Sequence, residues 1–579
     1  LETELSGPGY TLWDIIYPEI GPISLHGDAH SIEPWGWGVL RKDLMDRRDE
    51  RTYPGAAQAM SFIAVSDGET GLYIGAHDRK GYPMKFIMGK RENEDAVSLG
   101  IRHDVEGMGQ AKKYSIPYDV VTIPYLGDWY EAGRIYRQAT LKTPWGNIPP
   151  LAKRNDIPKW MKETDLWYLG SCHDETTAEQ ALTFAKYFEV PTSAHIYTWH
   201  KIPFDDHYPE YFPAKPGFKD AVRKVQEAGI PVMPYINGRL WDPATDSWKA
   251  KNAGEACAIN EDGEKYVEVY GSKVPLSPMC PYTKLWQETV VSLVDRLLND
   301  VGVKAVYIDQ ISAAAAKRCF AENHGHPVGG GTYWIQGYRE LLRQCLDHVP
   351  DGSALTTEEN ADPWNDLLHA WLMVNTQARG GEIVPLYPAV YAGRAISFGF
   401  QYIQGGDLPN RYPFRLKMAW AFLYGSQLGW VGSQVLNDEY AAEAEFLKNL
   451  CQVRHSARDA LQFGDLLPPV VLENAGTVSW TEETNEKETQ HTQPAVAATA
   501  WLTPDGKRKI AFTNVADDPK SVVATLNQRH LGESIGDAVT LLPIEGGSPI
   551  QLHQRSEGIW CANMILPARS ACIMEIQTP

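Results

Sequence analysis

The chain has 579 residues, of which 43% are hydrophobic and 22% charged, and its formal net charge is −19. That length is too great for one hydrophobic core, so we expect roughly two to four domains. No basic block offsets the negative charge, which argues against nucleic acid and against an anionic membrane surface as partners. No apolar run approaches the roughly 18 residues that cross a bilayer, so we expect a soluble protein.

The spacing of the cysteine residues indicates whether they form disulfides or bind metal, and the first residues of the sequence indicate whether a signal peptide is present. The eight Cys residues lie far apart, at positions 172, 257, 280, 319, 345, 451, 561 and 572. No CxxC pair and no Cys/His group has the spacing of a zinc site, so the sequence predicts buried reduced thiols and no metal site. The sequence begins at Leu1 without a signal-like segment, which leaves the compartment open and is compatible with a secreted or periplasmic protein. Nothing in the sequence indicates an oligomeric state.

Residues 1–150 are predicted to form an N-terminal β-sandwich followed by a linker helix. The runs 60–65 and 71–76 are strand-like and are separated by a turn signal at Asp67-Gly68. Residues 128–141 place apolar side chains at helical spacing. Four prolines between positions 144 and 158 then indicate a domain boundary.

Residues 151–455 alternate short apolar strands with amphipathic helices, which is typical of βα units around a parallel sheet. Eight strands over this span favour a (β/α)8 TIM barrel of the α/β class, because no Gly-rich fingerprint of a doubly wound sheet follows the first strand. The predicted helices are 176–188, 217–228, 284–299 and 333–349. The predicted strands are 166–169, 195–198, 231–236, 303–310, 353–358, 370–374, 383–387 and 428–431.

Residues 456–579 return to short strands joined by turns. The runs 497–502, 509–513 and 571–576 alternate or run apolar, and Pro504-Asp505-Gly506 has the composition of a turn. A C-terminal β-sandwich is the expected fold of this segment.

Two carboxyl groups end consecutive predicted strands of the barrel. Asp309 ends the fourth strand and Glu358 the fifth, with Glu359 as the competitor of Glu358. Strand alternation directs Asp309 and Glu358 into the barrel mouth, where barrel enzymes carry their active sites. Neighbouring strands lie about 4.8 Å apart, so the two carboxyl groups could reach the roughly 5 to 5.5 Å of a retaining glycoside hydrolase. Ion pairing or helix capping is the alternative role of such residues.

Other polar and aromatic residues follow the predicted strands and are candidates for substrate binding. Trp199 suits stacking on a sugar, and His200 or Asp206 suits hydrogen bonds to hydroxyl groups; the alternative is a proline-pinned loop that packs on itself. His324 lies in a Gly-rich loop and could touch substrate, whereas a metal site of His324 and His326 would need partners that the sequence does not name. The further candidates are Asn237, Arg239, Gln310, Asn360, Tyr387 and Tyr391.

Four motifs resemble those of a glycoside-hydrolase-like family that carries a domain of unknown function. They are Tyr-Ile-Asp-Gln at 307–310, the aromatic segment 199–213, His-Gly-His-Pro-Val-Gly-Gly-Gly at 324–331 and Thr-Thr-Glu-Glu-Asn at 356–360. That family is similar to α-retaining barrel hydrolases such as endo-α-N-acetylgalactosaminidases. The resemblance implies a barrel between two sandwiches, no cofactor, Asp309 as nucleophile and Glu358 as acid/base. Residues 387–394 depart from the polar pair expected there, which leaves the sugar subsites open.

The expected function is therefore retaining hydrolysis of an α-glycosidic bond in an oligosaccharide or glycoconjugate, with carbohydrate as the substrate. An inverting hydrolase, with carboxyl groups about 6.5 to 9.5 Å apart, is the first alternative. A carbohydrate-binding protein that uses a hydrolase scaffold without catalysis is the second.

Overall fold

The structure of the protein is a computed structural model that describes residues 1–24, 27–91, 96–374, 376, 381–400, 408, 410–484, 487–532 and 539–577. The chain divides into two compact units. The first comprises residues 1–148, 171–178 and 195–386, and the second comprises residues 149–170, 179–194 and 387–579. No helix in the described ranges is both long and apolar enough to cross a membrane.

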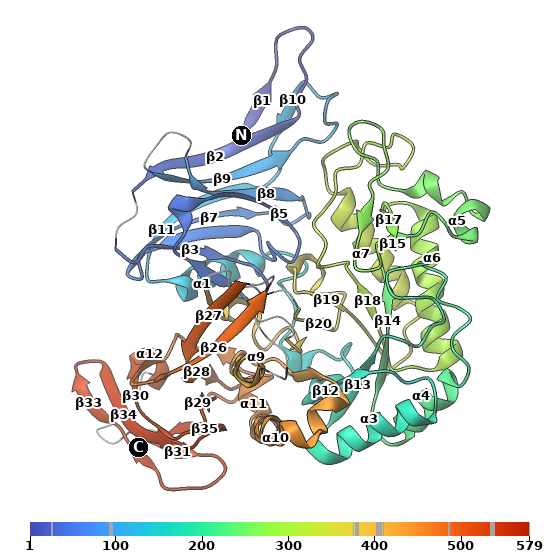
Figure 1. The fold of residues 1–579 in the computed structure, drawn as a ribbon. Coiled ribbons are helices and arrows are strands. Elements are labelled where there is room, and N and C mark those ends of the chain that lie inside the picture. The colour runs from blue at the N-terminus through green and yellow to red at the C-terminus, as the bar shows by residue number, and fades with distance from the viewer. Residues whose placement is uncertain are drawn as a thin grey trace. The chain divides into compact units, whose positions relative to one another are not determined.

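Two antiparallel sheets and a helix form the N-terminal part of the first unit (Figure 1). The expected strands at 60–65 and 71–76 and the expected helix at 128–141 are confirmed. One sheet has the order β2 (Asp14–Ile23), β9 (Val97–Asp104), β8 (Met84–Lys90) and β5 (Arg48–Tyr53). The other has the order β11 (Asp119–Leu126), β7 (Thr70–His77), β6 (Phe62–Ser66), β3 (His30–Glu33), β4 (Val39–Arg41) and β21 (Glu382–Ile383), and the helix is α1 (Trp129–Thr140).

Eight strands form the barrel that the sequence predicts. The strand pairs β12–β23, β14–β18, β18–β19 and β19–β20 are all parallel, and a parallel bridge between Phe398 and Gln427 joins the two ends of the sheet. The strand β18 is buried along its whole length, which fits its run of apolar residues. In sheet order the strands are β22 (Ser397–Phe398), β20 (Ala370–Leu372), β19 (Ala354–Glu358), β18 (Ala305–Asp309), β14 (Val232–Asn237), β13 (Thr192–Ile196), β12 (Leu166–Gly170) and β23 (Leu428–Val431).

Amphipathic helices connect these strands. In α4 (Phe218–Glu227) the buried residues are Phe218, Ala221, Val222 and Val225, a spacing that places them along one face of the helix. The other predicted helices are confirmed with slightly different bounds, as α3 (Glu175–Phe188), α6 (Lys284–Asp295) and α7 (Tyr333–Leu346).

The seventh predicted strand, at 383–387, is wrong. Glu382 and Ile383 form β21, which pairs antiparallel with β4 of the N-terminal sheet. The chain then enters the helix α8 (Leu386–Tyr391), and the barrel strand in this place is the two-residue β22. Of the apolar run 383–387, only its first residue, Ile383, belongs to a strand. The barrel strand β22 has two residues, which is too short to give a recognisable apolar pattern in the sequence.

Two antiparallel sheets close the chain, as expected for a C-terminal sandwich. Side chains from both sheets, such as Phe512 and Leu526, form one buried apolar cluster. One sheet has the order β24 (Asp465–Leu466), β28 (Val496–Leu502), β29 (Arg508–Asn514), β35 (Ser570–Gln577), β31 (Thr540–Pro543) and β32 (Ile550–Gln551). The other has the order β25 (Val471–Glu473), β30 (Lys520–Asn527), β34 (Ile559–Leu566) and β33 (His553–Ser556).

Candidate active site

Asp309 ends β18 and accepts hydrogen bonds on both carboxylate oxygens. The Tyr307 hydroxyl donates to Oδ1 at 3.0 Å, and the Tyr235 hydroxyl donates to Oδ2 at 3.1 Å. The amide nitrogen of Asn237 lies 3.4 Å from Oδ2. Three donors on one buried carboxylate fix its orientation and favour its charged form.

The backbone holds the Asn237 side chain in the orientation that faces Asp309. Its amide oxygen accepts hydrogen bonds from the backbone N–H groups of Arg239 at 2.9 Å and Leu240 at 2.8 Å. Since the oxygen is occupied in this way, the NH2 group is the part that points to Asp309. Asn237 and Asp309 are also paired in the register between β14 and β18.

Burial sets the protonation behaviour of Asp309. Removal from water raises its pKa to about 6, against the hydrogen bonds from Tyr307 and Tyr235, which lower it. The negative charge of Asp205 raises the pKa further. The carboxyl group therefore remains mostly ionised at neutral pH and becomes neutral a little below it.

Glu358 ends the neighbouring strand β19 at the same level as Asp309. The register pairs Tyr307 with Thr356 and Ile308 with Thr357, so the next position places Asp309 beside Glu358. Burial raises the pKa of Tyr197, and the negative charges of Asp309 and Glu358 raise it further. Since both charges act on the same tyrosine, the two carboxyl groups lie near the same side chain.

Glu359, the competitor of Glu358, points elsewhere. Its side chain is fully buried, and Oε1 accepts a hydrogen bond of 2.9 Å from the backbone N–H of Val374. Its backbone has a φ of 61°, which turns the chain immediately after the strand. Glu358 is partly exposed, so only Glu358 of the pair combines exposure with a place beside Asp309.

Arg239 and Gln310 belong to a second group of contacts next to Asn237 and Asp309. The Arg239 guanidinium forms an ion pair with Glu268, donates to the Tyr270 hydroxyl at 2.9 Å, and donates through Nε to Oε1 of Gln310 at 3.2 Å. Burial opposes the charge of Glu268, but Arg239 outweighs it and lowers the pKa of Glu268 to about 2. This buried pair positions Gln310 directly after the candidate nucleophile.

The aromatic segment 199–213 packs largely on itself, as the alternative interpretation proposed. The Trp199 ring is fully buried, its indole N–H donates to the Tyr235 carbonyl at 2.8 Å, and it stacks on Tyr211. His200 is also buried, and burial lowers its pKa to about 4. Neither side chain offers an exposed face to a sugar. Trp199 instead supports the strand that carries Tyr235.

Within the same segment Asp205, and not the predicted Asp206, is connected to Asp309 by hydrogen bonds. Asp206 is partly exposed and lies 2.6 Å from Nδ1 of His207. Asp205 is buried, and a series of hydrogen bonds connects it through the hydroxyl groups of Tyr208 and Tyr235 to Asp309. The sequence offered a signal for Tyr235, because it lies two residues before Asn237 and so faces the same side of its strand.

Three further predicted residues lie in other surroundings. Asn360 is fully buried, and its amide donates to the carbonyl of Gly36 at 2.8 Å, which is a packing contact with the N-terminal sheet region. Tyr387 and Tyr391 are buried side chains of α8, with ring centroids 4.8 Å apart. These contacts are packing contacts and do not involve Asp309.

His324 is buried beside cysteine residues. Its Nδ1 lies 3.6 Å from Sγ of Cys319, and His326 and Cys280 belong to the same group. The sequence named no partners for the two histidines, whereas the structure places Cys319 of the same loop and the distant Cys280 beside them.

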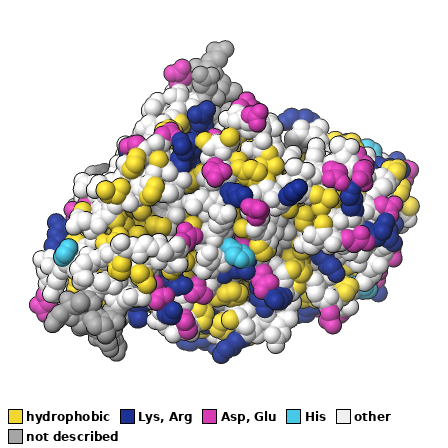
Figure 2. All heavy atoms as spheres, turned by 90° about the horizontal axis from the view of Figure 1, so that it is seen from below, with side chains coloured by type: hydrophobic (Ala, Val, Ile, Leu, Met, Phe, Trp, Pro, Cys, Tyr) yellow, Lys and Arg dark blue, Asp and Glu magenta, His cyan; other side chains and the backbone are white. Residues whose placement is uncertain are grey.

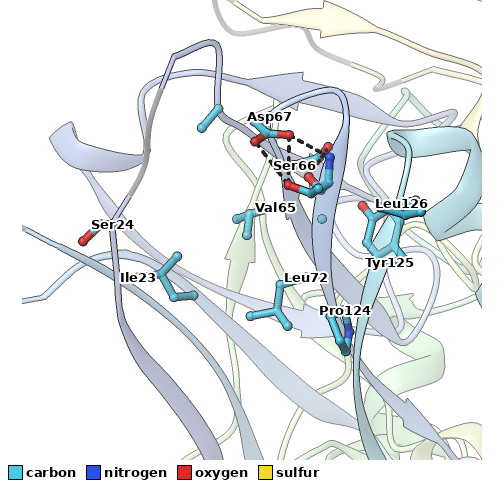
Figure 3. A pocket seen from close by; sticks show the side chains of 12 residues that line it. Ile23, Ser24, Val65, Ser66, Asp67, Leu72, Pro124, Tyr125 and Leu126 are labelled. Carbon is cyan, nitrogen blue, oxygen red and sulfur yellow. Dashed lines mark hydrogen bonds between the residues drawn. The ribbon is translucent and has the colours of Figure 1, made fainter.

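A separate hollow of about 640 Å³ lies on the N-terminal sheets (Figure 3). Its walls are mostly apolar, with Val65, Leu72 and Ile23 among the side chains that line it. The carboxylate at its rim, Asp67, accepts hydrogen bonds from the backbone of its own turn, at Glu69 and Thr70. This hollow therefore lacks the paired carboxyl groups of the barrel site.

The chain is similar to known proteins in sequence and in fold. A family described as "Domain of unknown function (DUF6259)" matches residues 114–402. A protein of Bacteroides thetaiotaomicron named "Putative glycoside hydrolase" is 31% identical over 92% of this chain and 78% of its own length. "Putative glycoside hydrolase 22789" of Monosiga brevicollis is 31% identical over 70% of this chain and 37% of its own length.

Solved structures show the same fold at low sequence identity. The α-N-acetylgalactosaminidase NagBb of Bifidobacterium bifidum, in complex with GalNAc, superposes with a TM-score of 0.64 at 14% identity, over 86% of this chain and 81% of the other. The GH36 α-galactosidase AgaA of Geobacillus stearothermophilus, as a variant in complex with 1-deoxygalactonojirimycin, gives a TM-score of 0.56 at 11% identity, over 97% of this chain and 76% of the other.

Proposed function

Since the chain carries a DUF6259 domain and belongs to the family of glycoside hydrolases that its 31% identical relatives represent, we propose that it cleaves an α-glycosidic bond with retention of configuration. Asp309 is the nucleophile and Glu358 the general acid/base. The observation that supports this proposal is the register of β18 and β19, which pairs Ile308 with Thr357, so that Asp309 and Glu358 are the next residues on two neighbouring parallel strands. Parallel strands about 4.8 Å apart suit the roughly 5 to 5.5 Å carboxyl separation of retaining enzymes.

In the first step an oxygen of Asp309 attacks the anomeric carbon while protonated Glu358 donates its proton to the leaving glycosidic oxygen. The bond between the anomeric carbon and that oxygen breaks, and an ester to Asp309 forms. Tyr235, Tyr307 and Asn237 hold the carboxylate in place, so little reorganisation is needed when its charge is consumed.

In the second step Glu358, now ionised, takes a proton from water, and the water oxygen attacks the anomeric carbon. The ester bond breaks and Asp309 leaves as a carboxylate. The same three donors stabilise the returning negative charge, and two inversions give net retention. Nothing in this cycle requires an additional cofactor.

The surface charge agrees with an uncharged carbohydrate substrate better than with a polyanion. On the face drawn in Figure 2, Lys and Arg side chains lie interspersed with Asp and Glu side chains. With a net charge of −19, this distribution offers no basic stripe on that face for nucleic acid.

The test is hydrolysis of a panel of aryl α- and β-glycosides with NMR of the first-formed anomer. The panel includes the α-N-acetylgalactosaminide and the α-galactoside, because the structural neighbours NagBb and AgaA are named for these sugars. We expect cleavage of an α-glycoside with the α-anomer formed first. A β-anomer formed first would indicate inversion, and binding to glycans without hydrolysis would indicate a lectin-like protein; either result would overturn the proposal.

A further inference from the structure

Four potential metal ligands from two segments of the chain converge in the first unit. They are Cys280, Cys319, His324 and His326, and all four side chains are buried. Each offers one ligand atom, and these atoms all lie within 4.8 Å of one another. We propose that they bind one zinc ion in a closed structural site of the Cys2His2 type.

The distances fit the edges of a zinc tetrahedron. Sγ of Cys280 lies 3.4 Å from Nε2 of His326, and Sγ of Cys319 lies 3.6 Å from Nδ1 of His324. Zinc bonds of about 2.3 Å to sulfur and about 2.0 to 2.1 Å to nitrogen at tetrahedral angles give sulfur-to-nitrogen edges of about 3.6 Å. Two thiolates and two imidazoles in a tetrahedral arrangement are a ligand set typical of structural zinc sites.

Both imidazole rings are oriented as metal ligands are. Nε2 of His324 lies 2.8 Å from the carbonyl oxygen of Glu255, and Nδ1 of His326 lies 2.8 Å from the carbonyl oxygen of Pro327. A carbonyl oxygen can only accept, so these two nitrogens carry the hydrogens. The other nitrogen of each ring therefore presents its lone pair to the thiols. A histidine that binds metal usually donates its second N–H in this way.

Further contacts support the group from outside. The backbone N–H of Ile259 points to Sγ of Cys319 at 3.5 Å, as expected for a thiolate that accepts a hydrogen bond. The ring of Tyr333 stacks on His326, with centroids 4.0 Å apart and planes 15° apart. Burial together with these contacts leaves no open position for substrate, which is the mark of a structural site.

The four ligands lie in two separate segments of the chain, which a zinc ion would hold together. Residues 310–332, between β18 and α7, form neither a helix nor a strand longer than a single bridge. Three of the ligands lie in this long loop, whereas Cys280 follows β17 (Pro275–Pro278) in the preceding excursion. Long loops without secondary structure need other constraints to hold one conformation. The ion would fasten this loop to that excursion.

One charged residue of this loop, Lys317, connects the loop to the contacts around the candidate active site. Lys317, two residues before Cys319, forms an ion pair of 2.9 Å with Glu268. Glu268 in turn pairs with Arg239, which contacts Gln310. Zinc binding would therefore preserve the surroundings of the carboxyl pair without taking part in the chemistry.

The test measures metal content rather than activity. Full-length protein from zinc-supplemented cells, desalted and analysed by mass spectrometry of the elements, should hold about one zinc ion per chain. The double variant Cys280→Ala/Cys319→Ala should hold less than about a tenth of that amount. The matched control is Cys345→Ala, which removes a buried thiol on α7 outside the group and should keep its zinc.

A second measurement on the wild-type protein covers the case in which the double variant does not fold. A mercurial thiol reagent should release the zinc to a chromogenic chelator as two thiols react. Protein grown with cobalt should show the visible absorption of tetrahedral cobalt with thiolate ligands. Zinc-replete wild-type protein without bound zinc, a Cys280–Cys319 disulfide in its mass spectrum, or unchanged zinc in a folded double variant would each overturn the proposal.

Discussion

The hydroxyl group of Tyr235 donates a hydrogen bond of 3.1 Å to Oδ2 of Asp309 from the neighbouring strand. Tyr235 pairs in register with Tyr307, and Asn237 pairs with Asp309, so two layers of side chains surround the carboxylate from β14 and β18. The layer of tyrosines lies below the layer that carries Asp309. Barrel packing thus supplies both the burial of the carboxyl group and the donors that keep it charged.

Replacing the nucleophile should remove turnover while leaving the fold intact. Asp309→Asn keeps the shape of the side chain but cannot form the covalent ester, so we expect a loss of at least about 10⁴-fold in kcat. Circular dichroism checks the fold, and Asp220→Asn, at an exposed position of α4, is the control. An undiminished rate for Asp309→Asn would refute its role.

Removing the acid should affect poor leaving groups most. Glu358→Ala should lower kcat/KM about 10² to 10⁴-fold for natural glycosides and much less for activated aryl glycosides, whose leaving groups need no proton. Glu340→Ala, half-exposed on α7, is the control. Equal losses for both kinds of substrate would contradict the acid role and would return Glu359 to consideration.

Tyr235→Phe should shift the pH profile. Its hydrogen bond lowers the pKa of Asp309, so its loss should move the acid limb of kcat/KM to higher pH. A hydrogen bond to a charged group contributes about 1.5 to 3 kcal/mol, which corresponds to a loss of activity of roughly 10 to 160-fold. Tyr10→Phe, at an exposed position, should leave the profile unchanged. A lower rate without a shifted limb would point to packing alone.

The raised pKa of Asp309 also predicts a pH dependence of stability. Its pKa is about 6 in the fold against 3.8 ordinarily, so its contribution to stability is complete below about pH 4 and is lost as pH rises through 6. The charged carboxylate then costs roughly 3 kcal/mol. Asp309→Asn should therefore melt at a higher temperature than wild type at pH 7 to 8 and near the wild-type temperature at pH 4. Equal melting temperatures at both pH values would disprove this cost.

The buried ion pair beside the site should be required for stability. Glu268→Gln leaves the Arg239 guanidinium without its counter-charge, so we expect a loss of about 3 to 5 kcal/mol. The pKa of Glu268 is lowered to about 2, so its stabilisation is present above its ordinary pKa and disappears as pH falls through 2. Scanning calorimetry at pH 7 measures the difference. The control Glu264→Gln, exposed in the same excursion, should melt like wild type.

Apolar runs in the sequence were sufficient to predict the barrel strands that are long and buried. Seven of the eight predicted barrel strands overlap observed barrel strands, and β18 with its terminal Asp309 lies where its apolar run predicted. The two-residue β22 has no such pattern, because its place in the sheet is fixed by neighbours distant in sequence. The prediction of a barrel strand at 383–387 failed for the same reason, because Ile383, the first residue of this run, pairs with β4 at the edge of the N-terminal sheet.

Local sequence patterns likewise predict some residues of the candidate site, whereas others depend on contacts between residues that lie far apart in the chain. Strand alternation alone directs Asp309 and Glu358 to one rim, and it also places Tyr235 and Tyr307 beneath them. The burial of Trp199 could not be read from its segment, since an aromatic run suits a sugar platform and a packed loop equally well. The group around His324 and His326 was missed because one of its members, Cys280, lies in a different loop, and only the fold brings it near the three residues of 319–326.

The pairing of β21 with β4 has a consequence for how this architecture can be divided or recombined. Glu382 and Ile383, which follow most of the barrel in the chain, complete the edge of a sheet built from the first 126 residues. A fragment that starts after the linker helix would release β21 and would also lose the carbonyl of Gly36 that Asn360 holds. A chimera in which the N-terminal region comes from a relative should therefore fold only when β21 is taken from that same relative.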